Sequence, residues 1–95
     1  MANEVEEFNA YREKMNSKIL AENNTVIKTK ELLGLVASTV LRCDDCVRYH
    51  LEKCHSEGLT KEQIAEALSI ATLVGGTIVI PHLRRAYEYL DVLEA

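Results

Sequence analysis

Residues 41–50 read LRCDDCVRYH and place two cysteines and a histidine in the pattern C-x-x-C-x-x-x-H. On an α-helix, residues three and four apart are surface neighbours, with Cβ atoms about 5–6 Å apart. Cys46 would therefore lie beside both Cys43 and His50 on one helix face. Two thiols at this spacing can form a disulfide, and an imidazole one turn further on can accept a thiol proton. The pattern predicts a nucleophile, a resolving thiol and a base.

The composition around this stretch predicts a small helical protein. The chain has 95 residues, of which 47% are apolar, with no Trp and four Gly. A domain of this size buries only a little over ~60% of the surface that its unfolded chain exposes, so its stability alone is marginal. The core must come mainly from Leu, Ile, Val and Ala on helices, and association between copies would add to it.

The charge pattern argues against several classes of partner. The 15 acidic and 11 basic residues are mixed along the chain and give a formal charge of -4. Without a basic run, we expect no nucleic acid partner. The N-terminus does not resemble a signal peptide, and the apolar stretch from Ala67 to Pro81 is too short to cross a bilayer. We therefore expect no membrane partner and a cytoplasmic location, where an odd cysteine count with a C-x-x-C pair fits a redox or metal site.

Apolar periodicity predicts an all-α fold of about five helices. The first is an amphipathic helix from about Val5 to Glu22, within an N-terminal arm of residues 1–26 that precedes a domain of residues 27–95. Inside that domain we expect helices at about Ile27–Leu41, from Cys43 or Asp44 to Glu57, from Thr60 to Gly75, and from Thr77 to Leu93.

Residues typical of helix ends support these bounds. Asp44 is a good N-cap for the third helix, and Gly58 suits its C-terminal end. Thr60 followed by Gln63 predicts a capping box at the start of the fourth helix. Pro81 is expected to kink the first turns of the fifth.

The charges near the two cysteines have opposing effects on thiol ionisation. A helix that begins at Cys43 places both thiols in its first turn, where the helix dipole favours a thiolate. Asp44 and Asp45 disfavour that charge, while Arg42 and Arg48 can compensate. The sequence leaves the direction of the net shift open.

The span from Thr29 to about Asp91 resembles the AhpD-like alkylhydroperoxidase branch of the carboxymuconolactone decarboxylase family. In the family pattern a Glu precedes C-x-x-C-x-x-x-H by eleven intervening residues, and Glu31 stands at that spacing before Cys43. The resemblance implies an AhpD-like helical domain that assembles as a homo-oligomer, usually a trimer or a hexamer. The segments that match the family are TKELLGLV (29–36), LRCDDCVRYH (41–50), GLTKEQI (58–64) and Gly75-Gly76.

The same resemblance implies a thiol peroxidase without a cofactor. Cys46 would attack a small organic hydroperoxide or peroxide to give a sulfenic acid, and Cys43 would condense with it to a disulfide. His50 and Glu31 would form the proton relay. An external dithiol, in the best-known relatives a lipoyl-bearing protein, would reduce the disulfide. In better-characterised peroxidases a His precedes the second cysteine, whereas this chain has Asp45, so thiol–disulfide exchange without peroxide turnover is an alternative.

Glu31 can join this site only under a geometric condition. Along one straight helix, Glu31 and Cys43 would be ~18 Å apart. The chain must therefore fold back between Leu41 and Asp44, or a neighbouring subunit must supply the contact. On the second helix, the side opposite the apolar arc is expected to hold Glu31, Gly34, Ser38 and Arg42.

Other functions compete with this one. A metal-binding C-x-x-C/His helical protein would use Cys43, Cys46, His50 and Cys54, but on one helix Cys43 and Cys54 are ~16 Å apart, too far for one tetrahedral zinc. A carboxymuconolactone decarboxylase-type enzyme acting on a small organic acid would not need the paired thiols. A purely structural helical oligomer would not use them either. We expect Cys54 to be structural, and His55 and His82 to be exposed.

Overall fold

The described part of the chain is built from helices alone. The computed structural model describes the backbone of residues 2–20 and 24–95 and the side chains of residues 3–14 and 27–95. No strand occurs in these ranges, which confirms the all-α fold. In chain order the elements are α1 (Ala2–Leu20), α2 (Asn24–Val40), α3 (Asp44–Ser56), α4 (Lys61–Gly75), the 3-10 helix η1 (Gly76–Val79) and α5 (Ile80–Glu94).

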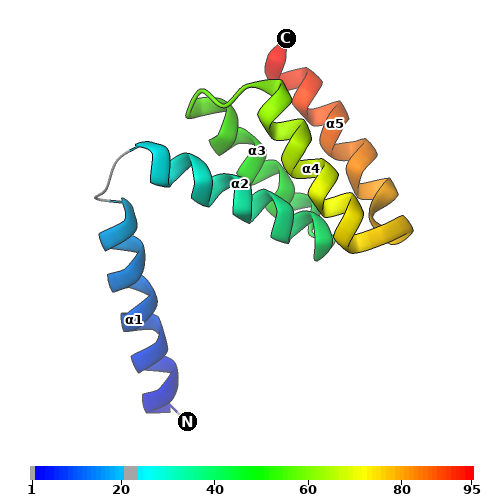
Figure 1. Cartoon of the computed structure of the whole chain (residues 1–95). Coiled ribbons are helices and arrows are strands. Elements are labelled where there is room, and N and C mark those ends of the chain that lie inside the picture. Colours follow the sequence, from blue (N-terminus) through cyan, green and yellow to red (C-terminus); the bar gives the residue numbers. More distant parts are fainter. Residues whose placement is uncertain (1, 21–23) are drawn as a thin grey trace.

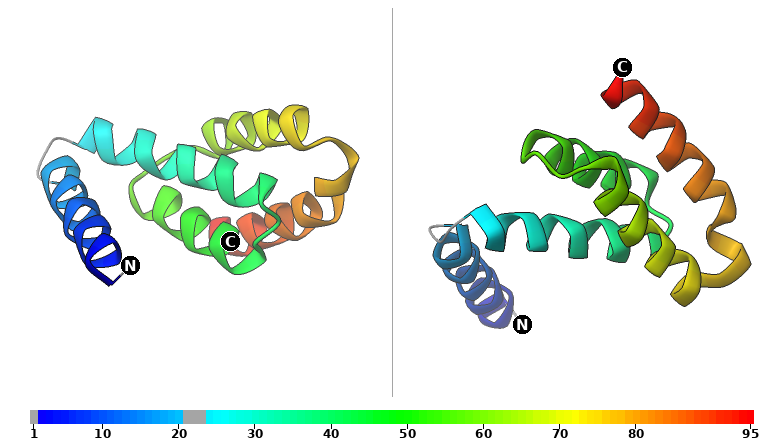
Figure 2. Two further views of the ribbon diagram at one scale, coloured as in Figure 1. Left: turned by 90° about the horizontal axis from the view of Figure 1, so that it is seen from below. Right: turned by 45° about the horizontal axis from the view of Figure 1, so that its top comes forward.

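Helices α2 to α5 form the body of the molecule, and α1 projects away from it (Figure 1). Within the body, α2 packs against α3 and α4, while α5 packs against α3 and α4. Figure 2 shows the same separation of α1 from two other directions. Side chains 3–14 of α1 are all exposed. The division into an arm and a domain at residue 26 stays a prediction, and Glu22, where the first helix was expected to end, lies outside the described residues.

An aliphatic core fills the space between the four body helices. Each fully buried Leu or Ile side chain contributes about 1.5–3 kcal/mol relative to leaving it in water. The largest of these side chains are Leu35 on α2, Leu51 on α3, Ile64 and Leu68 on α4, and Leu90 on α5.

Two of the predicted helix ends are confirmed. Gly58 ends α3 with a φ of 82°, and the next amide, that of Leu59, donates to the Cys54 carbonyl at 3.0 Å. Thr60 Oγ1 accepts from the Gln63 amide at 3.1 Å, and Gln63 Oε1 accepts from the Thr60 amide at 2.9 Å, which completes the capping box. These ends fix where α3 stops and α4 begins.

The expected kink at Pro81 is replaced by a turn that precedes it. The chain leaves α4 at Gly76, whose φ of 73° favours glycine, and passes through η1. Pro81 then lies in the first turn of α5, where the missing N–H has no helical partner to lose. The proline therefore starts a helix instead of bending one.

The segment Lys61–Glu94 could cross a membrane by length and composition alone, because it holds an 18-residue window of mean hydropathy 1.7. The structure folds it as two helices, α4 and α5, of 15 residues each. At 1.5 Å per residue each is about 22 Å long, shorter than the ~30 Å hydrocarbon core of a bilayer. Only 28% of the window is buried, so much of its apolar surface is exposed in a single copy of the chain.

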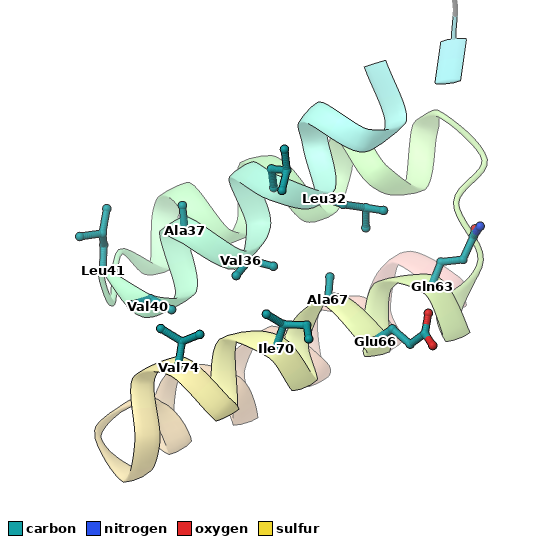
Figure 3. A pocket seen from close by; sticks show the side chains of 11 residues that line it. Leu32, Val36, Ala37, Val40, Leu41, Gln63, Glu66, Ala67, Ile70 and Val74 are labelled. Carbon is teal, nitrogen blue, oxygen red and sulfur yellow. The ribbon is translucent and has the colours of Figure 1, made fainter. Parts of the chain in front are cut away.

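Part of that surface lines an open groove between α2 and α4, with a volume of about 890 Å³. Figure 3 shows side chains from both helices pointing into it, among them Val36, Val40, Ile70 and Val74. Part of the apolar arc of α2 thus faces this groove, while Leu35 lies in the core. On its opposite side, Glu31 and Gly34 contact His50 of α3, and Ser38 is buried.

Replacing Leu90 by Ala should test the core. Leu90 is fully buried, so the cavity left behind should lower the free energy of unfolding by about 2–5 kcal/mol, measured by urea denaturation. Val92, on the same helix, is 68% exposed, and Val92→Ala should change stability by less than ~0.5 kcal/mol. Equal losses in the two variants would contradict the described packing of α5.

Candidate active site

The chain reverses between α2 and α3 within three residues, 41 to 43. Arg42 has a φ of 61°, the left-handed conformation usually taken by glycine after a helix. Its amide donates to the Thr39 carbonyl at 3.0 Å, and the Cys43 amide donates to the Ser38 carbonyl at 3.1 Å. This pair of bonds is a Schellman motif, and it meets the condition that the chain fold back before Asp44.

Cys43 caps the N-terminus of α3. It has an extended backbone, with φ -99° and ψ 95°, and its sulfur accepts from the Cys46 amide at 3.3 Å. The expectation that Asp44 would be the N-cap is therefore wrong, because Asp44 is already the first helical residue. Cys43 and Cys46 are joined by a disulfide, with their Cα atoms 5.2 Å apart. The sequence-predicted thiol pair is thus in its oxidised form at the start of a helix.

Glu31 and His50 meet across the interface between α2 and α3. The distance between Glu31 Oε2 and His50 Nδ1 is 2.8 Å, and their side chains are 12% and 25% exposed. With the carboxylate ionised, Nδ1–H donates to Glu31 and Nε2 is left as a proton acceptor. His50 lies one helical turn beyond Cys46, so the two side chains are neighbours on α3.

Gly34 makes room for the His50 ring. A Cβ at position 34 would lie 2.4 Å from His50 Cε1 and 2.7 Å from Nδ1, closer than any side chain tolerates. Glu31 is one turn before Gly34 on the same face of α2. The helix therefore presents a hydrogen-bond acceptor and, next to it, a gap into which the imidazole fits.

Cys54 is separate from the Cys43–Cys46 disulfide. It is fully buried in the core and is not part of a disulfide. Burial, together with the nearby Glu31 carboxylate, raises the pKa of the Cys54 thiol to about 12. A thiol held neutral in this way is a poor nucleophile, in agreement with the structural role expected for it.

A second cluster of charges reaches the start of α3 from α5. His82 Nδ1 lies 2.8 Å from Asp44 Oδ1, and Arg85 Nε donates to Asp44 Oδ2 at 3.0 Å. The His82 hydrogen bond, with help from the charge of Arg85, lowers the pKa of the Asp44 carboxyl. The expectation that His82 is exposed is wrong, since its side chain is only 17% exposed.

Sequence reasoning missed this cluster and the role of Gly34. The spacing of His82 and Arg85 shows that they share a helix face, but nothing in the sequence indicates that this face meets Asp44. Gly34 carried a usable signal, because a glycine inside a predicted helix needs a packing reason. The guanidinium of Arg48, which can compensate for the acidic residues, lies 5.3 Å from the Tyr89 ring centre.

This geometry does not favour a metal centre. Across the residues whose positions are described, no three His, Cys, Asp or Glu side chains come together in a way that could hold a metal ion. Cys54 is buried on the core side of α3, whereas Cys46 is exposed. The four sulfur and nitrogen ligands of the metal-binding alternative therefore do not converge.

Comparisons with known proteins agree on one family. The model of the carboxymuconolactone decarboxylase family matches residues 6–89. The fold is similar to the crystal structure of a member of that family from Thermotoga maritima, for which a role in an antioxidative response has been suggested. The TM-score is 0.76 at 53% sequence identity, and the match covers 99% of this chain and 92% of that one.

Two curated relatives match shorter stretches. Alkyl hydroperoxide reductase AhpD from Corynebacterium kroppenstedtii is 48% identical over 46 residues, which are 48% of this chain and 26% of that protein. An uncharacterized protein from Cupriavidus necator is 35% identical over 66 residues, covering 70% of this chain and 58% of the other. The chain thus spans about a quarter and somewhat over half of the lengths of these two relatives.

Replacing Gly34 by Ala should displace the His50 ring. An added Cβ in a helix normally stabilises by roughly 0.5–1 kcal/mol, but here it would overlap the imidazole. We expect no gain in stability and loss of the fixed Nδ1–H tautomer, measured by 15N NMR of the imidazole nitrogens. Ala37→Gly, at an exposed position of α2, gives the ordinary effect of one Cβ in this helix. A Gly34→Ala variant that is more stable and keeps the wild-type tautomer would show that the ring does not depend on this gap.

Proposed function

The chain belongs to the carboxymuconolactone decarboxylase family, and from this premise we propose that it is a thiol-dependent hydroperoxide reductase. Cys46 is the proposed nucleophile, Cys43 the resolving thiol, and His50 with Glu31 the proton relay. The observation that carries the proposal is the 2.8 Å hydrogen bond between Glu31 on α2 and His50 on α3, the helix that begins at the Cys43–Cys46 disulfide. Similarity to an alkyl hydroperoxide reductase over 46 residues adds support.

The proposed first step consumes the hydroperoxide. The Cys46 thiol transfers its proton toward His50 Nε2, and the thiolate attacks the terminal oxygen of ROOH. The O–O bond breaks, Cys46 becomes a sulfenic acid, and the leaving alkoxide takes the proton from His50 to give ROH. Glu31 holds the imidazole in the tautomer that accepts this proton and stabilises the imidazolium that forms.

The second and third steps return the enzyme to its starting state. The Cys43 thiol attacks the sulfenic sulfur of Cys46, water leaves, and the disulfide forms. A dithiol then reduces the disulfide by two successive exchanges and becomes a disulfide itself. The sum is ROOH and one dithiol converted to ROH, water and one disulfide. We propose a small organic hydroperoxide as oxidant and a dithiol reductant, of which a lipoyl-bearing protein is one candidate.

A second candidate function is disulfide exchange without peroxide turnover. Asp45 stands immediately before Cys46 and is exposed, in place of the histidine expected from the peroxidase pattern. A carboxylate there disfavours the Cys46 thiolate. In that case the same pair would exchange with protein or small-molecule disulfides, and the Glu31–His50 relay would assist the exchange.

A pulse of organic hydroperoxide on the reduced protein tests the peroxidase. Intact-mass analysis and peptide mapping should show the loss of two hydrogens at Cys43 and Cys46. Cys46→Ser should abolish this loss, and Cys43→Ser should stop at the sulfenic acid. His50→Gln should slow oxidation by roughly 10²-fold or more, as expected for loss of a general base. His55→Gln, at an exposed position of α3, is the matched control and should behave as wild type.

Two results would reject the peroxidase. Thiols that stay reduced under the hydroperoxide pulse but exchange with an added disulfide would favour the second candidate function. Cleavage of a lactone or a small organic acid that persists after both cysteines are replaced would favour the decarboxylase-type enzyme.

We also propose that copies of the chain associate through the groove between α2 and α4. Its walls are largely apolar and open to solvent, and several large apolar side chains nearby are more than half exposed, including Leu33, Leu73 and Val74. An apolar surface of this kind on a small chain is typical of an interface. A second copy would cover it and add to a marginal core.

Replacing Val74 by Asp tests this interface. Val74 is 67% exposed on the groove wall, and Val92 is 68% exposed on α5 outside it, so the two valines form a matched pair. Light scattering after gel filtration should show a larger mass than 10.7 kDa for wild type and for Val92→Asp, and a lower mass for Val74→Asp. A wild-type mass equal to that of one chain would reject the assembly.

A further inference from the structure

The cluster of Asp44, His82 and Arg85 joins two helices at the edge of the thiol pair. His82 and Arg85 are one turn apart on α5, and both contact the carboxylate of Asp44, one on each oxygen. Arg85 Nη2 also lies 3.2 Å from His82 Nδ1. These contacts bring His82 and Arg85 of α5 to the first turn of α3.

Asp44 is placed where its charge matters for the thiols. It follows Cys43 directly and is the first helical residue of α3. The helix dipole favours a thiolate at this end of α3. An uncompensated carboxylate here would weaken that effect and disfavour a thiolate on either cysteine. The two contacts from α5 give that carboxylate a cationic partner, and they hold the carboxyl ionised, as its lowered pKa indicates.

The other charges around the pair are engaged elsewhere or exposed. Glu31 is bonded to His50, and the Arg48 guanidinium lies over the Tyr89 ring. Asp45 and Arg42 are exposed. The charged and titratable groups on the elements that meet at the start of α3 are Arg42 from the turn, Asp44, Asp45, Arg48 and His50 from α3, Glu31 from α2, and His82 and Arg85 from α5.

We propose that His82 and Arg85 act as positioning residues that, through Asp44, favour ionisation of the Cys43–Cys46 pair. They do not touch the reacting sulfur atoms in this arrangement. Arg85 offsets the charge of the Asp44 carboxylate next to Cys43, and the two residues together hold this carboxylate turned toward α5. The inference rests on the proposed function only in taking Cys43 and Cys46 as the reactive pair, since thiol ionisation can be measured whether or not the protein reduces hydroperoxides.

The test is the pH dependence of thiol alkylation by iodoacetamide in the reduced full-length protein. Cys54 is buried with a pKa of about 12 and does not contribute near neutral pH. His82→Gln and Arg85→Gln should each raise the pKa of the reactive thiol by about half a unit to one unit. At pH 7 this is a roughly three- to ten-fold slower alkylation. Asp44→Asn should accelerate alkylation.

Combined variants show whether the effect passes through Asp44. In an Asp44→Asn background, His82→Gln should change the alkylation rate by less than about two-fold, because the carboxylate it offsets is gone. Arg85→Lys keeps the charge and should restore most of the wild-type rate. His55→Gln and Arg84→Gln, exposed residues on α3 and α5, are matched controls. Circular dichroism identifies any variant that fails to fold, and the Asp44→Asn and Arg85→Lys variants still test the proposal in that event.

Two outcomes would overturn the inference. One is a His82→Gln profile equal to that of His55→Gln together with an Arg85→Gln profile equal to that of Arg84→Gln. The other is an effect of His82→Gln that is as large in the Asp44→Asn background as in wild type. Both measurements can be made even if the protein does not reduce hydroperoxides. A protein that does not react with hydroperoxide but shows the predicted shifts in thiol pKa would reject only the proposed function.

Discussion

The reversal of the chain at Arg42 is the constraint on which the site depends. A left-handed residue after α2 closes a Schellman motif and turns α3 back along α2. Glu31, twelve residues before Cys43 in the sequence, is thereby brought into contact with His50, seven residues after it. A residue other than glycine in this conformation costs roughly 1 kcal/mol. The two amide bonds at the turn and the packing of α3 on α2 offset that cost.

Much of the fold follows from local signals that the sequence carries plainly. Gly58, Thr60 and Gln63 predict where α3 ends and α4 begins, because caps and left-handed glycines depend on a few neighbouring residues. The exposure of whole helix faces was harder to predict. Part of the apolar arc of α2 faces an open groove, while Ser38 on the other side of the helix is buried. Periodicity identifies two faces of a helix but does not say which neighbour each face meets.

The candidate site was also predictable only in part. The neighbours on one helix, Cys43, Cys46 and His50, were predictable from their spacing alone, and the family pattern added Glu31. The tertiary contacts were not predictable, since the contact of His82 with Asp44 depends on how α5 packs over the start of α3. Gly34 lies between these cases. Its place in a helix indicates close packing, but the sequence does not say that an imidazole fills the space.

The burial of Cys54 has a consequence for the covalent states of the molecule. Three cysteines allow three different pairings, two of which would include Cys54. Because that thiol is enclosed by the core and keeps its proton, only the pairing of Cys43 with Cys46 is reached while the chain is folded. Disulfide formation within the folded chain therefore gives a single isomer, with no scrambled form to be repaired.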